Sequence, residues 1–431
     1  MEDGLDMAFL FKRFKPLVLM GLLFVIALLV EIAYLRHYNV SYLISPDGEL
    51  YSNMAENLLQ GKGLVNTIRD RDYVVGPIYP LLLTFTYLLY GLKSYWAVIR
   101  LQAVLQALTA LVLYKTGEEL FGKGYGWIPY GLMLLYPLFP FWGIYVLTET
   151  TYVFILTLFL YILLIYSKKR LKPGKRLRIA LVMGLVIGIA NLVRPLLLLV
   201  FPFLLVWMCW VRGWRLKAGF KDFAIVVLMT VLVMCPWWIR NYLKYHQFIA
   251  VTNYGAYELY VGNNPYTITN QFYHFRVPTY DPEVKARVDS LPVLEQEKEY
   301  SRLAEAYILQ HPWKFVVRTV AKEANLFWKP VNSWEGKANN ILGWQLDQWY
   351  LILGLIGAFL SLFGLRKYGF LLFMTLYYSF VVSMITVVFI GRYRLPIMPA
   401  LVILGSLVFV TIIKGCVALA KELKKRREPR T

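Results

Sequence analysis

The stretch LISPDGELYSNMAENLL, residues 43–59, directly follows a long apolar run and carries the acidic residues Asp47 and Glu49 near its start. Ser45 and Pro46 predict a helix start, because a serine hydroxyl can cap the first backbone amides and proline suits the first helical position. Apolar residues then recur on one face, and nearby glycines predict the helix end. The stretch therefore predicts a short amphipathic helix with an acidic first turn where the chain leaves an apolar segment.

The composition indicates that the apolar segment is one of several membrane spans. Of the 431 residues, 58% are hydrophobic and 17% are charged, whereas soluble domains carry roughly a quarter charged residues. Runs of about twenty apolar residues predict an all-α polytopic membrane protein with about ten transmembrane helices. The expected spans are 16–34, 94–114, 126–142, 149–166, 179–193, 195–211, 222–240, 349–364, 369–390 and 395–414.

The net charge of +20 raises the alternative of a nucleic-acid-binding protein. Lys and Arg, however, fall in short bursts between the apolar runs, at 12–15, 168–178, 212–217 and 421–427. This distribution is typical of cytoplasmic loops under the positive-inside rule, so we expect membrane lipids as partners and no nucleic acid. The first apolar run lacks a following cleavage site and is interpreted as a retained anchor.

A topology with every basic burst in the cytoplasm leaves two larger segments outside, at 35–93 and 241–348. The second contains two helical patterns, 293–310 and 312–328, and the latter has the aromatic and apolar spacing of a helix lying in the membrane interface. We therefore divide the chain into a transmembrane module with the first outer loop, an extracytoplasmic loop, and C-terminal helices with a basic tail, at 1–240, 241–348 and 349–431.

Arginines recur at the outer ends of the spans, where positive residues are disfavoured. They are Arg194 in NLVRPLL, Arg240 beside Asn241 in CPWWIRNYLKY, and Arg392 and Arg394 in FIGRYRLPIMP. Snorkelling explains any one of them. Arg also binds phosphate bidentately and keeps its proton, so an outward group of arginines predicts a site for a lipid phosphate.

The chain resembles the GT-C glycosyltransferases of the protein O-mannosyltransferase and aminoarabinose-transferase type, family 39 and its bacterial relatives. The resemblance rests on the order of six segments, SPDGELYSNMAENLLQGKGL, GPIYPLLLTFTYLLYG, YVLTETTYVFILTLFLYIL, GLVIGIANLVRPLLLLVFPFLL, PWWIRNYLKYHQFIAVTNYGAYELYVGNNP and GRYRLPIMPALV. It implies a shared module of seven or so helices with amphipathic helices in the outer loops. It also implies a sugar donor linked to polyprenyl phosphate and an inverting transfer at the outer membrane face, usually without metal.

On this resemblance, Asp47 corresponds to the catalytic acidic residue of the family, and Glu149 matches an acidic residue of its second outer loop. The family often has adjacent Asp-Glu where this chain has Asp47, Gly48 and Glu49, which leaves the place of Glu49 open. From the residues alone, Asp47 and Glu149 have the alternative role of complementing a helix dipole.

The chemistry explains why these residue types would occur together. A departing phosphate needs fixed positive charge, and an acceptor hydroxyl needs a general base. We therefore expect Asp47 and Glu149 to be catalytic and no metal or other cofactor to be required. The expected ligands of the donor phosphate are Arg194, Arg240, Asn241, Arg392 and Arg394; candidates for sugar or acceptor contacts are Glu49, Tyr51, Tyr79 and Asn263.

The expected function is an inverting glycosyltransferase that moves a sugar from a polyprenyl-phosphate-linked donor to a hydroxyl- or amine-bearing lipid, glycan or protein. The expected location is the inner membrane of a prokaryote, with the site facing outward. A secondary transporter or flippase is the main alternative, and a non-catalytic scaffold is the next. Transporters tend to have internal repeats and ionisable residues at the midplane, and neither pattern is visible in this sequence.

Overall fold

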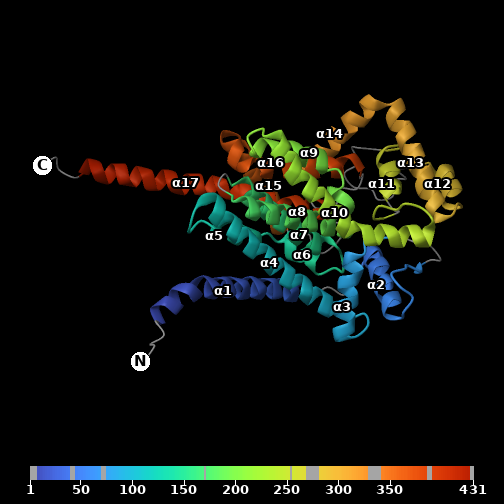
Figure 1. Ribbon diagram of the computed structural model, residues 1–431, viewed down its shortest axis with the longest axis horizontal. Coiled ribbons are helices and arrows are strands. Elements are labelled where there is room, and N and C mark those ends of the chain that lie inside the picture. The colour runs from blue at the N-terminus through green and yellow to red at the C-terminus, as the bar shows by residue number, and fades with distance from the viewer. Residues whose placement is uncertain are drawn as a thin grey trace.

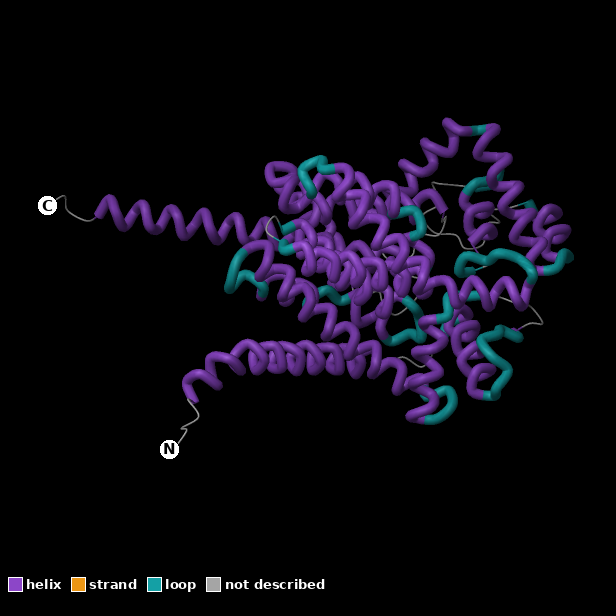
Figure 2. The backbone as a smooth tube through the Cα atoms, viewed as in Figure 1, coloured by secondary structure: helices purple, strands orange, loops and turns teal. Residues whose placement is uncertain are grey.

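The computed structural model describes residues 7–38, 44–68, 74–168, 171–252, 255–267, 281–328, 341–385 and 391–427. Within these ranges the chain forms helices joined by loops, and no strand is present (Figure 2). The predicted all-α class is therefore confirmed. The last residues of the expected span 369–390 lie outside the described residues.

The first half of the chain supplies most of the bundle. Its helices are α1 (Met7–Tyr38), α2 (Pro46–Leu59), α3 (Ile78–Tyr90), α4 (Tyr95–Phe121), α5 (Trp127–Leu134), α6 (Leu138–Gly143), α7 (Glu149–Ser167), α8 (Pro173–Val193), the 3₁₀ helix η2 (Pro195–Leu197), α9 (Phe201–Val211) and α10 (Leu216–Tyr245).

The second half adds a group of mostly short helices and then returns to the bundle. Its helices are α11 (Gly255–Gly262), α12 (Pro282–Asp289), α13 (Val293–Gln310), α14 (Pro312–Trp328), α15 (Ile341–Ser361), η4 (Leu362–Gly364), α16 (Leu365–Ile385), the 3₁₀ helix η5 (Gly391–Ile397) and α17 (Met398–Arg427). The bounds of α13 and α14 match the predicted patterns, and both helices are confirmed.

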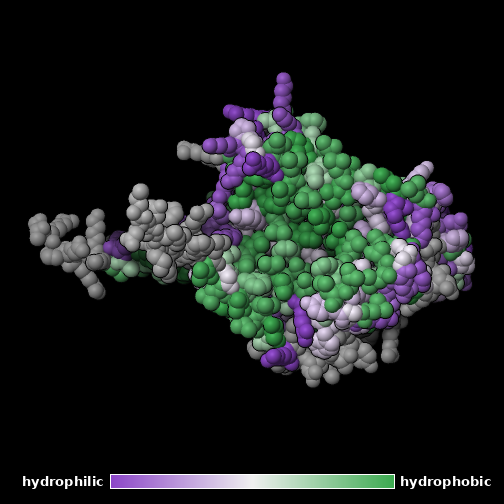
Figure 3. Space-filling model, turned by 60° about the horizontal axis from the view of Figure 1, so that its bottom comes forward, coloured by the Kyte–Doolittle hydropathy of each residue, from purple (hydrophilic) through white to green (hydrophobic). Residues whose placement is uncertain are grey.

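Six helical segments of the described chain are long and apolar enough to cross a membrane, and shorter apolar helices lie beside them. Figure 3 shows hydrophobic side chains over the middle of one face, with hydrophilic ones gathered at its margins. Such a belt is what a bilayer requires of a spanning bundle. The membrane class is therefore confirmed, whereas the number of ten spans stays a prediction.

Two of the expected spans are wrong in their extent. The run 126–142 is divided into α5 and α6 around Pro137, because a proline nitrogen cannot donate the hydrogen bond that would continue the helix. The run 195–211 begins with the short turn η2, so its α-helix starts only at Phe201.

The two ends of the molecule are formed by different helices (Figure 1). The start of α1 and the end of α17 lie toward one end, where α17 extends beyond the bundle, and α2, α3 and α11–α13 lie at the other. Within the segment 241–348, the described helices α11 and α14 both pack against α16.

Helix α8 packs closely against α10, and this contact helps to fix the position of the end of α8. A Cβ atom on Gly184 would lie 2.4 Å from the carbonyl oxygen of Val226, and one on Gly188 would lie 2.7 Å from the side chain of Val233. Small residues four positions apart allow helix axes to approach closely in membranes. The close contact of the two helices thereby fixes the position of Arg194, the residue that follows α8.

Candidate active site

A cavity of about 290 Å³ lies where α2, the end of α8, α11 and η5 meet. Charged and polar side chains on its wall come from segments far apart in sequence. They are Asp47, Tyr51, Arg194, Thr252, Glu258, Arg392 and Tyr393. The wall therefore includes four of the candidate residues from the sequence, namely Asp47, Tyr51, Arg194 and Arg392.

Asp47 occupies the first turn of α2, and the local sequence explains its placement. The Ser45 hydroxyl accepts a hydrogen bond from the Gly48 amide at 3.1 Å, and Pro46 begins the helix, as predicted. Gly48 lies against the segment before Glu149, because a Cβ atom there would be 2.6 Å from the carbonyl oxygen of Val146. The glycine that separates Asp47 from Glu49 thus lets α2 approach the start of α7.

Two arginines and two carboxylates form one cluster. Arg392 Nη1 lies 3.0 Å from Asp47 Oδ2, and Arg392 Nε lies 3.8 Å from Glu149 Oε1. The same Glu149 oxygen is 3.0 Å from Arg194 Nη1. Asp47 is thereby linked to Arg194 through Arg392 and Glu149, and the four charges balance within the cluster.

Exposure distinguishes the two carboxylates. The Asp47 side chain is 44% exposed, whereas that of Glu149 is 1% exposed and does not line the cavity. Glu149 lies behind the two guanidinium groups, each of which reaches the cavity wall. Asp47 can therefore meet a bound molecule directly, while Glu149 can act only on the arginines.

Glu258 is a cavity residue that the sequence interpretation missed. It lies in α11, and burial raises its pKa above the ordinary range of a glutamate, while the Arg392 guanidinium acts in the opposite direction. A buried carboxyl group with a raised pKa holds its proton more readily and can then donate a hydrogen bond. The available signal was one acidic residue within the aromatic run NYGAYELYVG.

Tyr51 and Tyr79 differ in their access to the cavity. Tyr51 lines the wall, and burial together with the charge of Asp47 raises its pKa to about 12, so its hydroxyl stays protonated at neutral pH. Tyr79 is fully buried behind it, with ring centroids 5.2 Å apart, and donates to Gln102 Oε1 at 2.8 Å. Of the two, Tyr51 is the one that can contact a ligand.

Arg394 does not line this cavity, although it is only two residues from Arg392. It is buried, forms an ion pair with Asp347 of α15, and donates from Nε to the Leu326 carbonyl oxygen at 2.8 Å. Tyr136, in the break between α5 and α6, donates to Asp347 at 2.9 Å. The contacts tie η5 to the bundle and hold the segment that carries Arg392; the expected phosphate role of Arg394 is not supported.

Removal of the Tyr136 hydroxyl is expected to weaken this anchor. In Tyr136→Phe the carboxylate of Asp347 loses a buried donor, and such bonds to charged groups contribute about 1.5–3 kcal/mol. We expect a lower thermal unfolding midpoint in detergent, measured against Tyr90→Phe, a control at a residue that is 66% exposed. Equal midpoints for the two variants would show that the hydroxyl contributes nothing to stability.

Arg240 and Asn241 also lie outside the lining of the cavity. Arg240 bonds to the Leu64 carbonyl oxygen and to Asn241 Oδ1, and its guanidinium lies 4.8 Å from the ring centroid of Trp237. Asn241 is buried and donates to the Ile249 carbonyl oxygen at 3.1 Å. Arg240 thus joins the end of α10 to the segment after α2, and Asn241 joins it to the segment after α10. This geometry does not support their expected role at the phosphate.

The remaining candidates make structural contacts or face away. Asn263 is buried and donates to the carbonyl oxygens of Leu259 and Met384, both at 3.0 Å, which closes α11 against α16. Glu49 is exposed and does not line the cavity. Their proposed sugar contacts stay predictions without support from this geometry.

The arrangement can hold an anion beside a base. Two guanidinium groups offer several N–H donors to phosphate oxygens, and an exposed carboxylate lies next to one of them. Among the described residues, no group of three or more His, Cys, Asp or Glu side chains has a metal-site arrangement.

Comparison with known proteins identifies proteins with a similar sequence profile or fold. Residues 74–239 match the sequence profile of the family described as dolichyl-phosphate-mannose-protein mannosyltransferase. No curated protein matches the chain. The structure is similar to the archaeal oligosaccharyltransferase AglB from Archaeoglobus fulgidus in complex with an inhibitory peptide and a dolichol-phosphate, with a TM-score of 0.57 and 14% identity over 98% of this chain.

A second structure of the Archaeoglobus fulgidus oligosaccharyltransferase, tethered with an acceptor peptide, has a TM-score of 0.56 and 12% identity over 94% of this chain. The chain spans about half the length of these archaeal proteins, 53% and 50% respectively. ArnT from Cupriavidus metallidurans bound to undecaprenyl phosphate gives a TM-score of 0.49 and 14% identity over 97% of this chain and 82% of ArnT. The chain is thus a membrane protein with the GT-C glycosyltransferase fold whose residues 74–239 match the dolichyl-phosphate-mannose-protein mannosyltransferase family, as the resemblance in its sequence predicted.

Proposed function

We propose that the protein is an inverting glycosyltransferase that takes a sugar from a polyprenyl-phosphate donor and transfers it to a hydroxyl- or amine-bearing acceptor. The observation that carries the proposal is the contact of Arg392 with Asp47 on the wall of one cavity, with Arg194 beside them. The family match at residues 74–239 supports a donor in which the sugar is linked to a polyprenyl phosphate. It does not favour a transporter or flippase.

The proposed step divides the work between Asp47 and the arginines. The acceptor oxygen attacks the anomeric carbon of the sugar while the bond from that carbon to the phosphate oxygen breaks. The electron pair stays on the departing phosphate, where Arg392 and Arg194 stabilise the added charge. Asp47 takes the proton of the acceptor as general base. Attack opposite the leaving phosphate inverts the configuration of the sugar.

Glu149 is a positioning residue in this proposal. Its buried carboxylate contacts both Arg194 and Arg392, and so it holds the two guanidinium groups at the cavity wall. Before the donor binds, Asp47 and Glu149 neutralise the arginines. A donor phosphate then competes with Asp47 for Arg392, which frees the carboxylate to accept a proton.

We further propose that the cavity faces outward from a prokaryotic inner membrane. The end of the molecule with α2 and α11–α13 (Figure 1) would lie outside. The connection between α7 and α8, which includes Lys172, would lie in the cytoplasm. In a background with Cys416, the exposed native cysteine, replaced by Ser, we expect an impermeant thiol reagent applied outside to label Lys298→Cys and not Lys172→Cys. The reverse pattern would contradict the outward-facing site.

Metal chelation is expected to leave the transfer reaction intact. The arginines already supply positive charge to a single leaving phosphate, so a divalent cation would have no further charge to neutralise. Turnover measured with and without EDTA should agree within a factor of about two. This is well below a tenfold change, which corresponds to about 1.36 kcal/mol of activation free energy. Loss of turnover on chelation, with recovery on Mg²⁺ or Mn²⁺ addition, would make Asp47 a metal ligand instead.

The proposed function is tested with purified protein and a panel of polyprenyl-monophosphate sugars. We expect release of free polyprenyl phosphate together with transfer of the sugar to a lipid, glycan or peptide acceptor pool. If the protein instead moves an intact lipid-linked sugar between leaflets of a vesicle, without breaking the sugar–phosphate bond, the proposal is wrong.

A further inference from the structure

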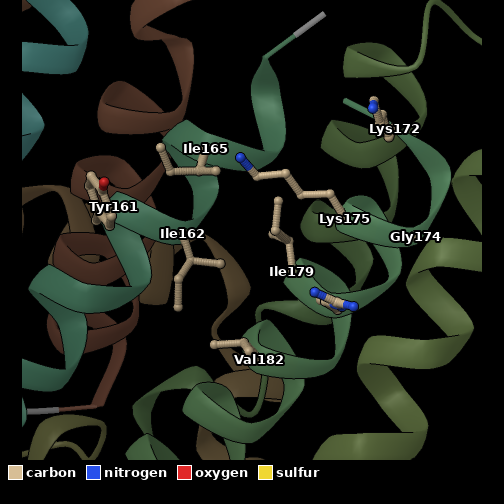
Figure 4. Close-up of a pocket in the computed structure, with 9 residues that line it drawn as sticks. Tyr161, Ile162, Ile165, Lys172, Gly174, Lys175, Ile179 and Val182 are labelled. Atoms are coloured by element: carbon tan, nitrogen blue, oxygen red, sulfur yellow. The ribbon is translucent and has the colours of Figure 1, made fainter. Parts of the chain in front are cut away.

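A second hollow lies between the end of α7 and the start of α8, with a volume of about 670 Å³. Isoleucine and valine side chains of both helices form one part of its wall (Figure 4). They are Ile162, Ile165, Ile179 and Val182. Val182 is 45% exposed, so the apolar part of the groove is open at the surface of the membrane-spanning bundle.

The other part of the groove is basic. Lys172, Lys175 and Arg178 line it, and each of these residues is exposed. Figure 4 shows Lys175 extending from α8 toward Ile165 of α7. No acidic residue is present among the nine described residues that line the groove. Three cations beside an apolar channel fit a molecule with an anionic head and a hydrocarbon tail.

The groove lies far from the cavity with Asp47. Glu149 begins α7 and Arg194 follows the end of α8, whereas the groove lies at the other end of each helix. α7 begins with Glu149 and has 19 residues, which span about 28 Å at the usual helical rise. α8 has 21 residues and ends just before Arg194, so it spans about 31 Å. These lengths match the hydrocarbon thickness of a bilayer, roughly 30 Å, so the groove and the cavity open at opposite leaflets.

We propose that this groove binds an anionic phospholipid of the membrane. Its phosphate would lie among Lys172, Lys175 and Arg178, and an acyl chain would follow Ile162, Ile179 and Val182 between the helices. Phospholipids are the abundant amphiphiles in the leaflet next to the groove, and an anionic headgroup complements a wall with three positive charges and no negative one. A bound lipid would join α7 to α8 at the end remote from Glu149 and Arg194.

The test measures lipid retention by native mass spectrometry of the full chain in detergent. The probes are dioleoyl-phosphatidylglycerol, dioleoyl-phosphatidylcholine and undecaprenyl phosphate, each titrated separately. We expect the wild type to retain one phosphatidylglycerol in preference to phosphatidylcholine. The triple variant Lys172→Gln, Lys175→Gln, Arg178→Gln should weaken that binding on the order of a hundredfold, since each cation near an anionic lipid contributes substantially.

A matched control removes the same number of positive charges at another place on the surface. Arg215, Lys217 and Lys221 at the start of α10 are also exposed and do not line the groove, so their triple Gln variant should bind phosphatidylglycerol as the wild type does. Val182→Trp fills the apolar part without a change of charge and should weaken binding about tenfold, comparable with the loss of roughly two buried methylene groups.

The outcomes decide the proposal independently of the transfer reaction. Equal retention of phosphatidylcholine, or equal losses in the groove and control triple variants, would mean that no groove-specific anionic lipid site exists. Preferential retention of undecaprenyl phosphate that the groove variant abolishes would assign the groove to a different ligand. Full binding by Val182→Trp would also overturn the proposal, even where the triple variant fails to fold.

Discussion

Asp47→Asn is expected to lower turnover by about a hundredfold or more, because a positioned general base contributes roughly 10²–10⁴-fold. The variant keeps the size of the side chain and one acceptor oxygen for Arg392. In the wild type, Arg392 Nη1 lies 3.0 Å from Asp47 Oδ2. It loses the ability to take a proton from the acceptor. The measurement is turnover with a polyprenyl-phosphate sugar, together with donor affinity, which should persist.

Glu49→Gln is the matched control for this variant. It removes a carboxylate from the same turn of α2, but Glu49 is exposed and outside the cavity lining. We expect turnover close to that of the wild type. If Asp47→Asn retained comparable turnover, Asp47 would act only at the start of the helix, and the base would have to be another residue, with Glu258 the next carboxyl group on the wall.

Arg392→Lys is expected to lose about a hundredfold or more in turnover, since removal of one fixed donor from an anion-stabilising site typically costs 10²–10³-fold. Arg392 contacts Asp47 and Glu149 through different nitrogens, at 3.0 and 3.8 Å. A lysine ammonium is a compact charge without the planar fork that makes these contacts together. Arg366→Lys, at an exposed position in the first turn of α16, is the control.

A double variant separates the two roles. Asp47 and Arg392 are in contact, so the combined loss in Asp47→Asn, Arg392→Lys should be smaller than the product of the single losses. Multiplicative losses would instead indicate that the base and the phosphate-binding arginine act without influence on each other.

The parts of the fold that follow from local rules could be predicted. Ser45 and Pro46 determine the start of α2 through interactions within one turn. The periodicity of 293–310 and 312–328 similarly predicted α13 and α14, the second of which begins at Pro312. The run 126–142 failed because hydropathy counts apolar residues, whereas Pro137 breaks the backbone hydrogen bonding on which a continuous span depends.

The arginines illustrate what the sequence could not determine. Arg392 and Arg394 are two residues apart in a 3₁₀ helix, where each residue turns the chain by about 120°, so their side chains point in different directions. Which one meets the cavity depends on Asp347, more than forty residues upstream and paired with Arg394. Arg240 was equally conspicuous at a helix end, but its contact with the Leu64 carbonyl oxygen joins segments far apart in sequence and becomes apparent only in the folded chain.

The central claim is that Arg392 and Arg194 present a polyprenyl phosphate to Asp47 within the cavity. An experimental structure of the protein with undecaprenyl phosphate tests it most directly. The account predicts phosphate oxygens at hydrogen-bond distance, on the order of 3 Å, from the Arg392 guanidinium, with the Asp47 carboxylate beside them. A phosphate bound at Arg240 or Arg394, or at any place where Asp47 cannot reach the anomeric carbon, would contradict it.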